Sequence, residues 1–254
     1  MVTLLLGVLI PGSAAGQVLL PASEDYTLRI EYLWWSPSPS GQIQKGVGEF
    51  SGTLLDIEED LAVEKGKANN LRGAFRLGGG WKLRGAWTDL DFGGDTFVDR
   101  PFLYGTLVAR SGDQVVTSLK GNVISADLEW DFVQQDWGYF GALVGVRFFD
   151  VDTLMLNVAT ANRVAETFRL PVPVLGLAGR FYLGERISFE GEVTGITAGS
   201  RGHFWDWIVA LRIHATHNLA GTTGYRSQSL EGQDGRDFFG LRMNTWTFGL
   251  EISL

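Results

Sequence analysis

The sequence contains no cysteine and only three histidines among its 254 residues. Disulfide bonds and thiolate metal sites are therefore excluded. Proline is scarce, with seven residues, and lysine plus arginine (21) are outnumbered by aspartate plus glutamate (29). The resulting net charge of −8 argues against a nucleic-acid-binding protein, which would need a basic surface.

Long apolar runs are also missing. Beyond the first residues, no segment reaches the unbroken stretch of about 18 apolar residues that a membrane-spanning helix needs. Glycine (34), phenylalanine (16) and tryptophan (9) are abundant instead. This combination is typical of long β-strands joined by tight turns, more than of a helical enzyme.

The N-terminal segment has the pattern of a secretory signal. An apolar run from Val2 to Ile10 is followed by Pro11 and by small residues around Ser13 to Gly16. No lysine or arginine precedes the run, so a buried strand or a misassigned start is the alternative. We predict a signal peptide over residues 1–16 and a single domain over residues 17–254.

Large apolar residues alternate with polar ones from Tyr26 to Trp35, which is the period of a β-strand. Segments of this kind recur along the chain. We predict an all-β chain of about ten strands, with eight as the alternative, near residues 26–35, 70–78, 81–90, 116–132, 138–150, 167–183, 187–197, 203–216, 218–227 and 237–254.

The connections between these strands alternate in length. Short ones fall near residues 78–80, 133–138, 184–186 and 217–218; long ones cover about 36–69, 91–115, 151–166 and 228–236, with 198–202 as an exception. Short turns on one side and long loops on the other are typical of bacterial outer-membrane barrels. A soluble barrel has no reason to sort its loops by side.

The chain ends in the sequence TFGLEISL, which places Thr247, Gly249, Ile252 and Leu254 in a polar-x-Gly-x-x-apolar-x-apolar pattern. This pattern resembles the C-terminal signal by which outer-membrane barrels are handed to the barrel-assembly machinery. The usual last residue is aromatic, and here it is Leu254. With the export signal and the loop asymmetry, the chain resembles the small bacterial outer-membrane β-barrel proteins.

This resemblance implies a closed antiparallel up-and-down transmembrane β-barrel with short periplasmic turns and long extracellular loops. It also implies a location in the cell outer membrane and a monomer. The implied partners are outer-membrane lipid, lipopolysaccharide and the barrel-assembly machinery, with no nucleic acid. A soluble secreted β-barrel is the competing fold.

The alternation then assigns one face of each strand to lipid and the other to the lumen. A lipid-facing girdle is predicted at Tyr26, Tyr32, Trp34, Trp81, Trp87, Trp205, Trp207 and Trp246. A lumen charge network is predicted from Arg29, Glu31, Arg72, Arg76, Lys82, Arg84, Asp127, Glu129, Asp131, Arg147, Arg180, Glu190, Glu192, Asp206, Arg212, His214, Arg226 and Glu251.

Two hairpins give predictions of register. A turn centred on Glu185 sets Arg180 across from Glu190, an opposite-charge pair. A turn centred on Gly79 sets Arg76 across from Lys82, and these like charges require a neighbouring carboxylate. We therefore expect an acidic side chain within hydrogen-bond distance of Arg76 or Lys82.

Three functions are compatible with the sequence. The first is a non-enzymatic barrel with a charge-filled lumen, no cofactor and no metal, whose acidic extracellular loops provide binding or a barrier. The second is a narrow channel for small ions or solutes, because inward-facing glycines could leave a wet path. The third is a surface hydrolase resembling the omptin proteases, using Asp89, Asp91, His203 and Asp206.

Two other kinds of site fit the sequence less well. A lipid A deacylase would need a histidine–serine pair near the lipid-facing surface, and no His-x-Ser motif is present. The acidic segments Asp56–Lys67 and Glu231–Asp237 lack the spacing of a calcium-binding EF-hand loop, and solvated loops are the simpler interpretation. Asp56–Lys67 could also form a short helical or extended cap over the mouth of the barrel.

Overall fold

The computed structural model describes residues 26–254, so the predicted signal peptide over residues 1–16 lies outside the described residues. Within this range the only helix is the 3₁₀ turn Gly199–Arg201, and no helix is long and apolar enough to cross a membrane. The strands are β1 (Leu28–Trp35), β2 (Ser38–Gln44), β3 (Leu55–Asp56), β4 (Lys67–Gly78), β5 (Trp81–Phe97), β6 (Phe102–Tyr104), β7 (Leu107–Ala109), β8 (Gln114–Gln135), β9 (Gly138–Asn157), β10 (Asn162–Tyr182), β11 (Ile187–Thr197), β12 (Gly202–His214), β13 (Leu219–Asp234) and β14 (Asp237–Ser253).

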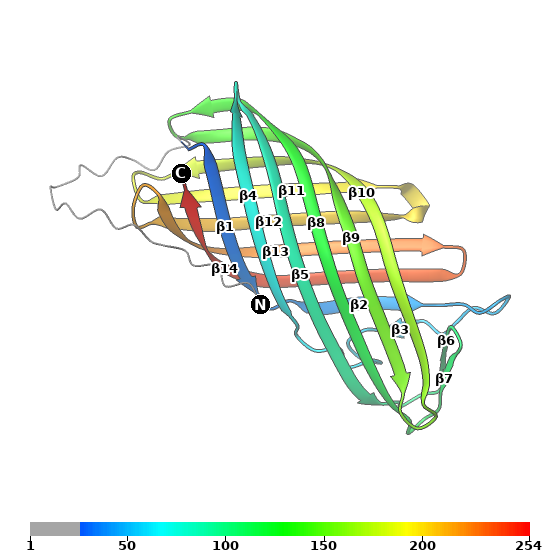
Figure 1. Ribbon diagram of the computed structural model, residues 1–254. Coiled ribbons are helices and arrows are strands. Elements are labelled where there is room, and N and C mark those ends of the chain that lie inside the picture. Colours follow the sequence, from blue (N-terminus) through cyan, green and yellow to red (C-terminus); the bar gives the residue numbers. More distant parts are fainter. Residues whose placement is uncertain (1–25) are drawn as a thin grey trace, which may run out of the picture.

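Ten of these strands close into an antiparallel barrel in the order β1-β4-β5-β8-β9-β10-β11-β12-β13-β14, and β14 pairs back onto β1. The predicted ten-strand up-and-down barrel is therefore confirmed. Figure 1 shows the tight turns and the C-terminus at one end and the loops at the other. Closure leaves no sheet edge along this part of the wall, as hydrocarbon requires of a spanning sheet.

The seam between β14 and β1 depends on a glycine of the predicted assembly signal. Gly249 lies directly across from Leu33. A Cβ atom at Gly249 would lie 2.2 Å from the backbone oxygen of Tyr32, which is closer than any side chain could tolerate. The glycine thus has a structural role at the seam that does not depend on recognition of the C-terminal segment by the assembly machinery.

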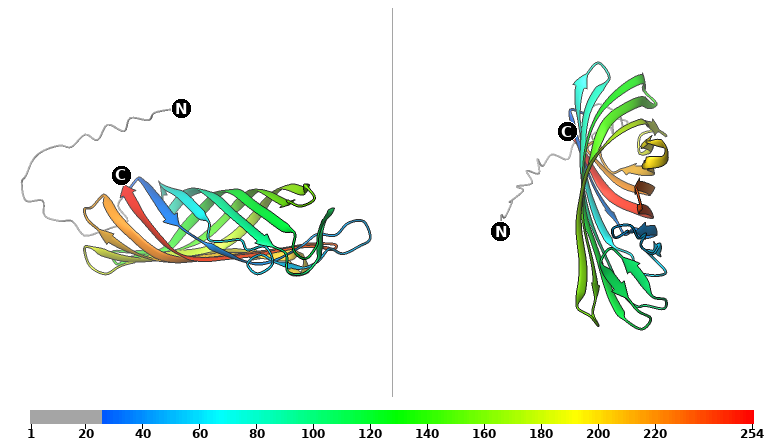
Figure 2. Two further views of the ribbon diagram at one scale, coloured as in Figure 1. Left: turned by 90° about the horizontal axis from the view of Figure 1, so that it is seen from below. Right: turned by 90° about the vertical axis from the view of Figure 1, so that its right-hand side faces the viewer.

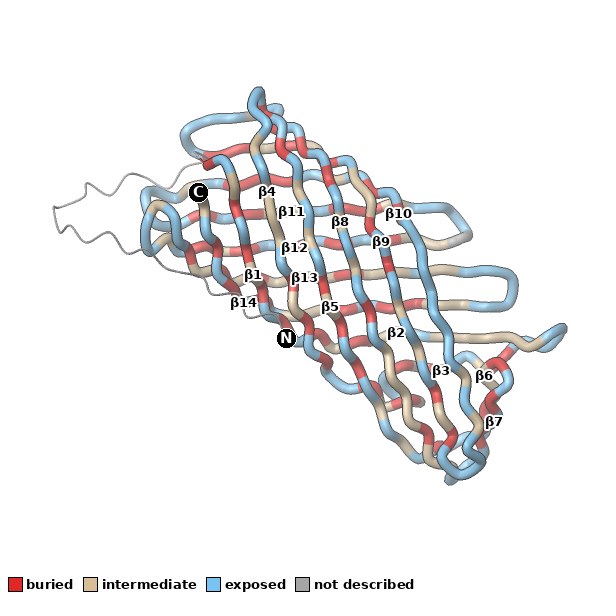
Figure 3. Tube along the Cα trace, in the orientation of Figure 1, coloured by how far each residue is buried: buried red, intermediate tan, exposed pale blue. Residues whose placement is uncertain are grey.

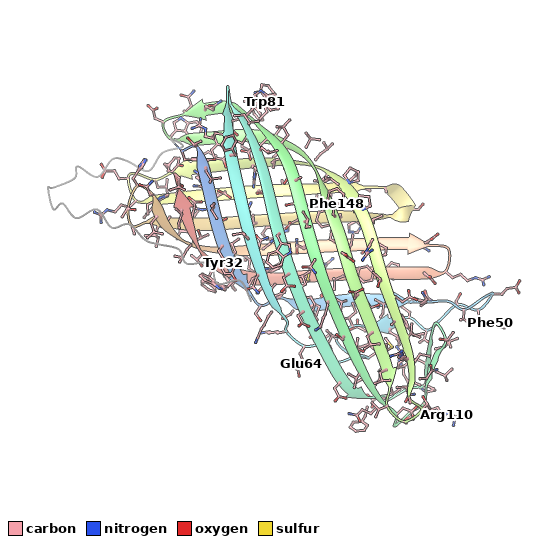
Figure 4. The ribbon with its side chains drawn as sticks, viewed as in Figure 1. Tyr32, Phe50, Glu64, Trp81, Arg110 and Phe148 are labelled. Carbon is pink, nitrogen blue, oxygen red and sulfur yellow. The ribbon has the colours of Figure 1, made fainter. Side chains whose placement is uncertain are left out.

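Burial alternates along the barrel strands, as Figure 3 shows. The outward residues form a continuous apolar belt with tryptophans at both ends, and Figure 4 places Trp81 near the short-turn end and Phe148 in the middle of the wall. Large apolar side chains exposed over a whole surface are built to contact lipid. The predicted girdle residues that point outward are Tyr32, Trp34, Trp81, Trp87, Trp205, Trp207 and Trp246.

The assignment of Tyr26 to the lipid-facing girdle is wrong. Its side chain is only 7% exposed and lies inside the barrel, with the guanidinium carbon of Arg29 3.8 Å from its ring centroid. The backbone N–H groups of Thr27 and Leu28 both donate to the carbonyl oxygen of Leu254. This irregular pairing shifts the alternation by one residue before β1 begins, so the sequence pattern could not be extended back to Tyr26.

The extracellular ends of several strands are longer than predicted. The expected loop 151–166 is mostly strand, because β9 continues to Asn157 and β10 begins at Asn162. The expected loop 228–236 likewise shrinks to a tight hairpin between Asp234 and Asp237. Above the bilayer no lipid selects apolar outward residues, so the alternation that identifies a strand fades while the hydrogen-bonded ladder continues.

These extensions make one side of the barrel taller than the other. Pairing between β10 and β11 ends at Leu175 and Gly195, and the two strands diverge above that pair. The upper parts of β5, β8, β9 and β10, here called the wing, continue as a four-stranded sheet. Figure 2 shows these green strands reaching toward the loop end of the molecule.

The free edge of the wing contains two prolines. The ladder between β9 and β10 runs through both Pro171 and Pro173. A proline fits a ladder where its nitrogen faces away from the partner strand. Because the two are separated by one residue, both nitrogens face the unpartnered edge of β10, where no hydrogen-bond donor is needed.

An apolar core fills the extracellular end of the molecule. The loops 45–66 and 98–113, together called the crown, pack between the wing and the upper ends of β2 and β14. Figure 4 shows Phe50 and Arg110 of the crown at the end of the molecule opposite Trp81. The buried core residues are Trp35, Leu55, Ile57, Leu61, Val63, Ala68, Leu90, Phe92, Val98, Phe102, Leu107, Ala109, Val115, Met155, Leu241 and Met243.

Backbone contacts hold the crown in place. The short strand β3 pairs with β2, and Val63 forms a bridge with Gly94 on β5. The acidic segment from Asp56 to Lys67 is therefore an ordered cover, with its apolar residues directed into the mouth of the barrel. Its alternating acidic and apolar residues reflect this one-sided burial.

Replacing Leu107 by alanine should loosen the crown without opening the barrel. Leu107 is fully buried, and truncating such a side chain costs about 2–5 kcal/mol. We expect trypsin to cleave after Arg110 at least about tenfold faster, because cleavage needs local opening. The matched control is Val108→Ala on the same strand, since Val108 is 53% exposed. Equal cleavage rates in the two variants would contradict this account of the crown.

Candidate functional site

The interior of the lower barrel is filled by charged side chains. Every one of the ten barrel strands contributes polar or charged side chains to this lumen charge network, here called the lattice. Most of these side chains are buried. Buried charges are costly unless they are paired and hydrogen-bonded.

Two arginines organise the part nearest the short turns. Arg180 contacts Glu190, its predicted cross-strand partner, and lies 2.7 Å from Glu251 on β14. Arg212 lies 2.7 Å from Glu31, 2.9 Å from Glu190 and 2.8 Å from Glu251. The pairs with Glu31 and Glu251 join strands that are not neighbours in the sheet, so they tie the wall together across the lumen.

A second group lies above the first. Arg72 and Arg84, on adjacent strands, both contact Glu192 across the lumen. Arg84 also lies 2.6 Å from Glu129, and the amino group of Lys82 lies 3.1 Å from the same carboxylate. The lattice is therefore continuous from β4 through β5 to β8 and β11.

The hairpin from β4 to β5 has the predicted register, with Arg76 across from Lys82. The expected carboxylates are present at Lys82, which lies 2.8 Å from Asp131 in addition to Glu129. Its amino group also lies 3.3 Å from the ring centroid of Tyr139. The like charges of the hairpin are thus offset by acids on the next strand.

The upper part of the lattice consists of pairs between neighbouring strands. Asp127 on β8 contacts Arg147 on β9. Asp206 on β12 lies 2.7 Å from Arg226 on β13 and accepts a further hydrogen bond, 3.0 Å long, from Gln228. These pairs mark the boundary with the apolar core of the crown.

Two predicted lumen residues have other surroundings. The Nε2 atom of His214 lies 2.9 Å from the hydroxyl oxygen of Ser188. Arg76 is half-buried, and its guanidinium carbon lies 5.7 Å from the ring centroid of Tyr26. Both residues lie at the short-turn end of the lumen.

The space left among these side chains is small. It amounts to about 70 Å³ within the described part of the chain, and charged residues line most of it. Ten strands make a barrel only slightly wider than the eight-stranded type that side chains fill, whereas porins with aqueous channels use 16–18 strands. The lower barrel is a filled structure.

Titratable groups of the crown are tied into its backbone and side chains. Two hydrogen bonds from Arg100, 2.7 and 3.1 Å long, hold the pKa of Asp60 below its usual value. A backbone hydrogen bond from Arg110 lowers the pKa of Asp113. Burial raises the pKa of Tyr104 to about 12. The two carboxylates are therefore anchors of the crown rather than free ligands.

The predicted omptin-like hydrolase site is not assembled. Asp206 points into the lumen and pairs with Arg226, whereas His203 on the same strand points outward. Asp89 and Asp91 face outward on β5, which is not adjacent to β12 in the sheet. The four residues were grouped by their closeness to strand ends, and that criterion does not fix which face or which side of a barrel they occupy.

His203 has different neighbours, which the sequence interpretation missed. It lies on the outer face of β12 with the hydroxyl oxygen of Ser229 3.4 Å from its Nε2 atom and a carboxylate oxygen of Glu231 3.4 Å from its Nδ1 atom. No His-x-Ser motif marks this group, because the histidine and the serine lie on adjacent strands. A turn centred on His217 would have shown it, since His203 and Glu231 are equally far from that residue and pair directly.

His203 and Ser229 line an outward groove across β12, β13 and β14. The rest of the lining is Trp205, Trp207, Ser227, Arg242 and Asn244. The groove lies just above the apolar belt, next to a row of aromatic rings formed by Trp207, Tyr225 and Trp246.

No protein-family model matches the sequence, and no curated protein is a significant match. The crystal structure of the outer membrane protease OmpT from Escherichia coli is similar, with a TM-score of 0.62 and 9% identity over 94% of this chain and 100% of that chain. The translocator domain of the autotransporter NalP from Neisseria meningitidis has a TM-score of 0.48 and 10% identity over 90% of this chain and 88% of that chain. At these identities the likeness concerns the fold alone: the chain has the fold of the bacterial outer-membrane β-barrels.

Removing Arg180 should strongly destabilise the barrel. In an Arg180→Leu variant, Glu190 and Glu251 lose a buried partner, which costs about 3–5 kcal/mol in the free energy of unfolding. The control is Arg169→Leu, whose pair with Asp150 is largely exposed and should contribute at most about 1 kcal/mol. Urea unfolding of protein refolded into lipid vesicles, followed by tryptophan fluorescence, measures both. Similar losses in both variants would show that the lattice is not what stabilises the wall.

Proposed function

We propose that the protein is a monomeric, non-conducting barrel of the outer membrane that presents a preformed acidic surface to the outside. The observation that carries this proposal is the crown, whose loops are folded over an apolar core instead of extending into solvent. A binding surface that is ordered before it meets its partner loses less conformational entropy on binding. The lumen is proposed to carry out no chemistry, since its charged groups contact one another.

The outer surface of the crown carries carboxylates. Glu58, Glu59, Glu64 and Asp99 are exposed, and Figure 4 places Glu64 on the rim of the molecule. Acidic groups grouped on a rigid support attract a cationic partner and speed its encounter. The proposed ligand class is therefore basic, such as a cationic peptide or a basic patch of another protein.

The remaining proposed partners contact the wall. Membrane lipid and lipopolysaccharide would surround the apolar belt. The barrel-assembly machinery would recognise the C-terminal strand, in which Ile252 and Leu254 are exposed on the outer face while Thr247 is buried inside.

A narrow channel is the competing function, and planar-bilayer recording distinguishes the two. We expect no resolved conductance steps from the purified wild type, because the lattice fills the lumen. A variant with Arg72, Arg84 and Glu192 all replaced by serine removes the central contacts and should show steps if the lattice is the seal. Resolved steps from the wild type would contradict the proposed barrier.

Charge reversal tests the proposed binding surface. Proteoliposomes of zwitterionic lipid should bind a fluorescent oligolysine peptide several-fold less when Glu58, Glu59 and Glu64 are changed to lysine, with the difference shrinking as salt is raised. The matched control reverses Asp136 and Glu185, which are exposed at the short turns. Equal binding by the crown variant and the wild type would exclude the crown as the acidic docking surface.

A further inference from the structure

Three side chains on the outer wall are arranged as a nucleophile, a base and an acid. The hydroxyl of Ser229 lies against one ring nitrogen of His203, and the carboxylate of Glu231 lies against the other. In the tautomer that carries its proton on Nδ1, that proton is on the side of the Glu231 carboxylate, 3.4 Å away, and Nε2 accepts from the serine hydroxyl. A histidine held in this way by an acid can withdraw the proton of a serine, as in serine hydrolases of unrelated folds.

The ladder explains why the three groups meet. Ser229 and Glu231 are two residues apart on β13 and therefore point to the same face. His203 is directly across from Glu231, and Trp205 is directly across from Ser229, so the imidazole reaches diagonally to the serine. On the other side of Glu231 lies Gly240, which has no side chain to obstruct the group.

We propose that Ser229, His203 and Glu231 form a hydrolytic site for the carboxylic esters of membrane lipids in the outer leaflet. The proposed substrate follows from the depth of the groove in the membrane. Trp205 lies level with Ser229, and Trp207 and Trp246 lie beside the groove on the side of the apolar belt. Tryptophans of this kind mark the interface between acyl chains and headgroups, and the acyl ester bonds of lipids lie at that depth.

The same groove offers hydrogen-bond donors for the charge that develops during the reaction. Arg242 is directly across from Ser229 on β14, and Asn244 is directly across from Ser227. Within residues 26–254, no carboxylate forms an ion pair with Arg242. Its guanidinium is thus available to an oxyanion at the serine, while the tryptophans provide an apolar surface for the acyl chain.

The reaction requires only the lipid ester and water. The oxygen of Ser229 attacks the acyl carbonyl carbon as its proton passes to Nε2 of His203, and the tetrahedral intermediate collapses by breaking the bond to the alcohol oxygen. His203 returns the proton to that leaving oxygen. Water then attacks the acyl-serine, His203 takes up a proton from the water, and the fatty acid leaves as the proton returns to Ser229.

The test uses the full-length protein refolded into mixed micelles, with heat-modifiable gel migration to verify the barrel of each variant. A fluorophosphonate probe should label Ser229 in the wild type, and labelling should fall at least about 1,000-fold in Ser229→Ala and in His203→Ala. Glu231→Gln should lower the labelling rate by about 10- to 1,000-fold and change the pH profile of that rate, because the acid orients the imidazole. Ser111→Ala, which changes an exposed serine of the crown outside the groove, should leave the labelling rate at the wild-type value.

Two substrates distinguish the source of the ester. Phosphatidylethanolamine and lipopolysaccharide are supplied separately, and the fatty acid released is identified by mass spectrometry. Release from either substrate that depends on Ser229 and His203 supports the proposal and names the lipid. Absence of both fatty-acid release and probe labelling in correctly folded wild type, or full activity in Ser229→Ala, would overturn it.

Discussion

The structure depends on one constraint: backbone N–H and C=O groups in contact with hydrocarbon have no water to bind, so the sheet must close. Closure then fixes what each face can be. The outer face must be apolar, and the inner face must satisfy its own polar groups without lipid or bulk water. The ion pairs across the lumen, such as those from Arg180 and Arg212, follow from that second requirement. Such pairs make the wall and its filling a single unit, because each arginine is held by strands on opposite sides.

Much of this arrangement was predictable from local patterns, and the exceptions have physical reasons. The pairing of Arg180 with Glu190 followed from a tight turn, which fixes register by itself. The contact of Arg72 with Glu192 could not be predicted, because it exists only once strands distant in sequence face each other across a closed barrel. Tyr26 was assigned to the wrong face because alternation fails where the ladder becomes irregular.

The packing of the crown was predicted only in part, as a cap that residues 56–67 could form over the barrel mouth, and the outer groove was missed; the reasons differ. The sequence from Leu55 to Val63 carries alternating apolar residues, but its acids favoured an interpretation as a solvated loop. The burial of this segment depends on the wing, which extends beyond the lipid. In that region the outward-facing residues are polar, so apolar and polar residues no longer alternate in the way that identifies a strand. The group around His203 was missed because a motif along one strand was sought, whereas the contacts run between strands. Register, more than sequence proximity, decides which side chains meet on a sheet.

Crowding in the membrane plane gives Pro171 and Pro173 a consequence beyond their own strand. An exposed ladder with regular donors is a template on which a neighbouring chain can add a strand, and rows of such additions produce aggregates. At this edge two successive donor positions are absent, so an incoming strand would find acceptors without the matching N–H groups. The edge of β10 can therefore remain unpaired in a membrane crowded with copies of the protein, and neighbouring barrels do not join through it.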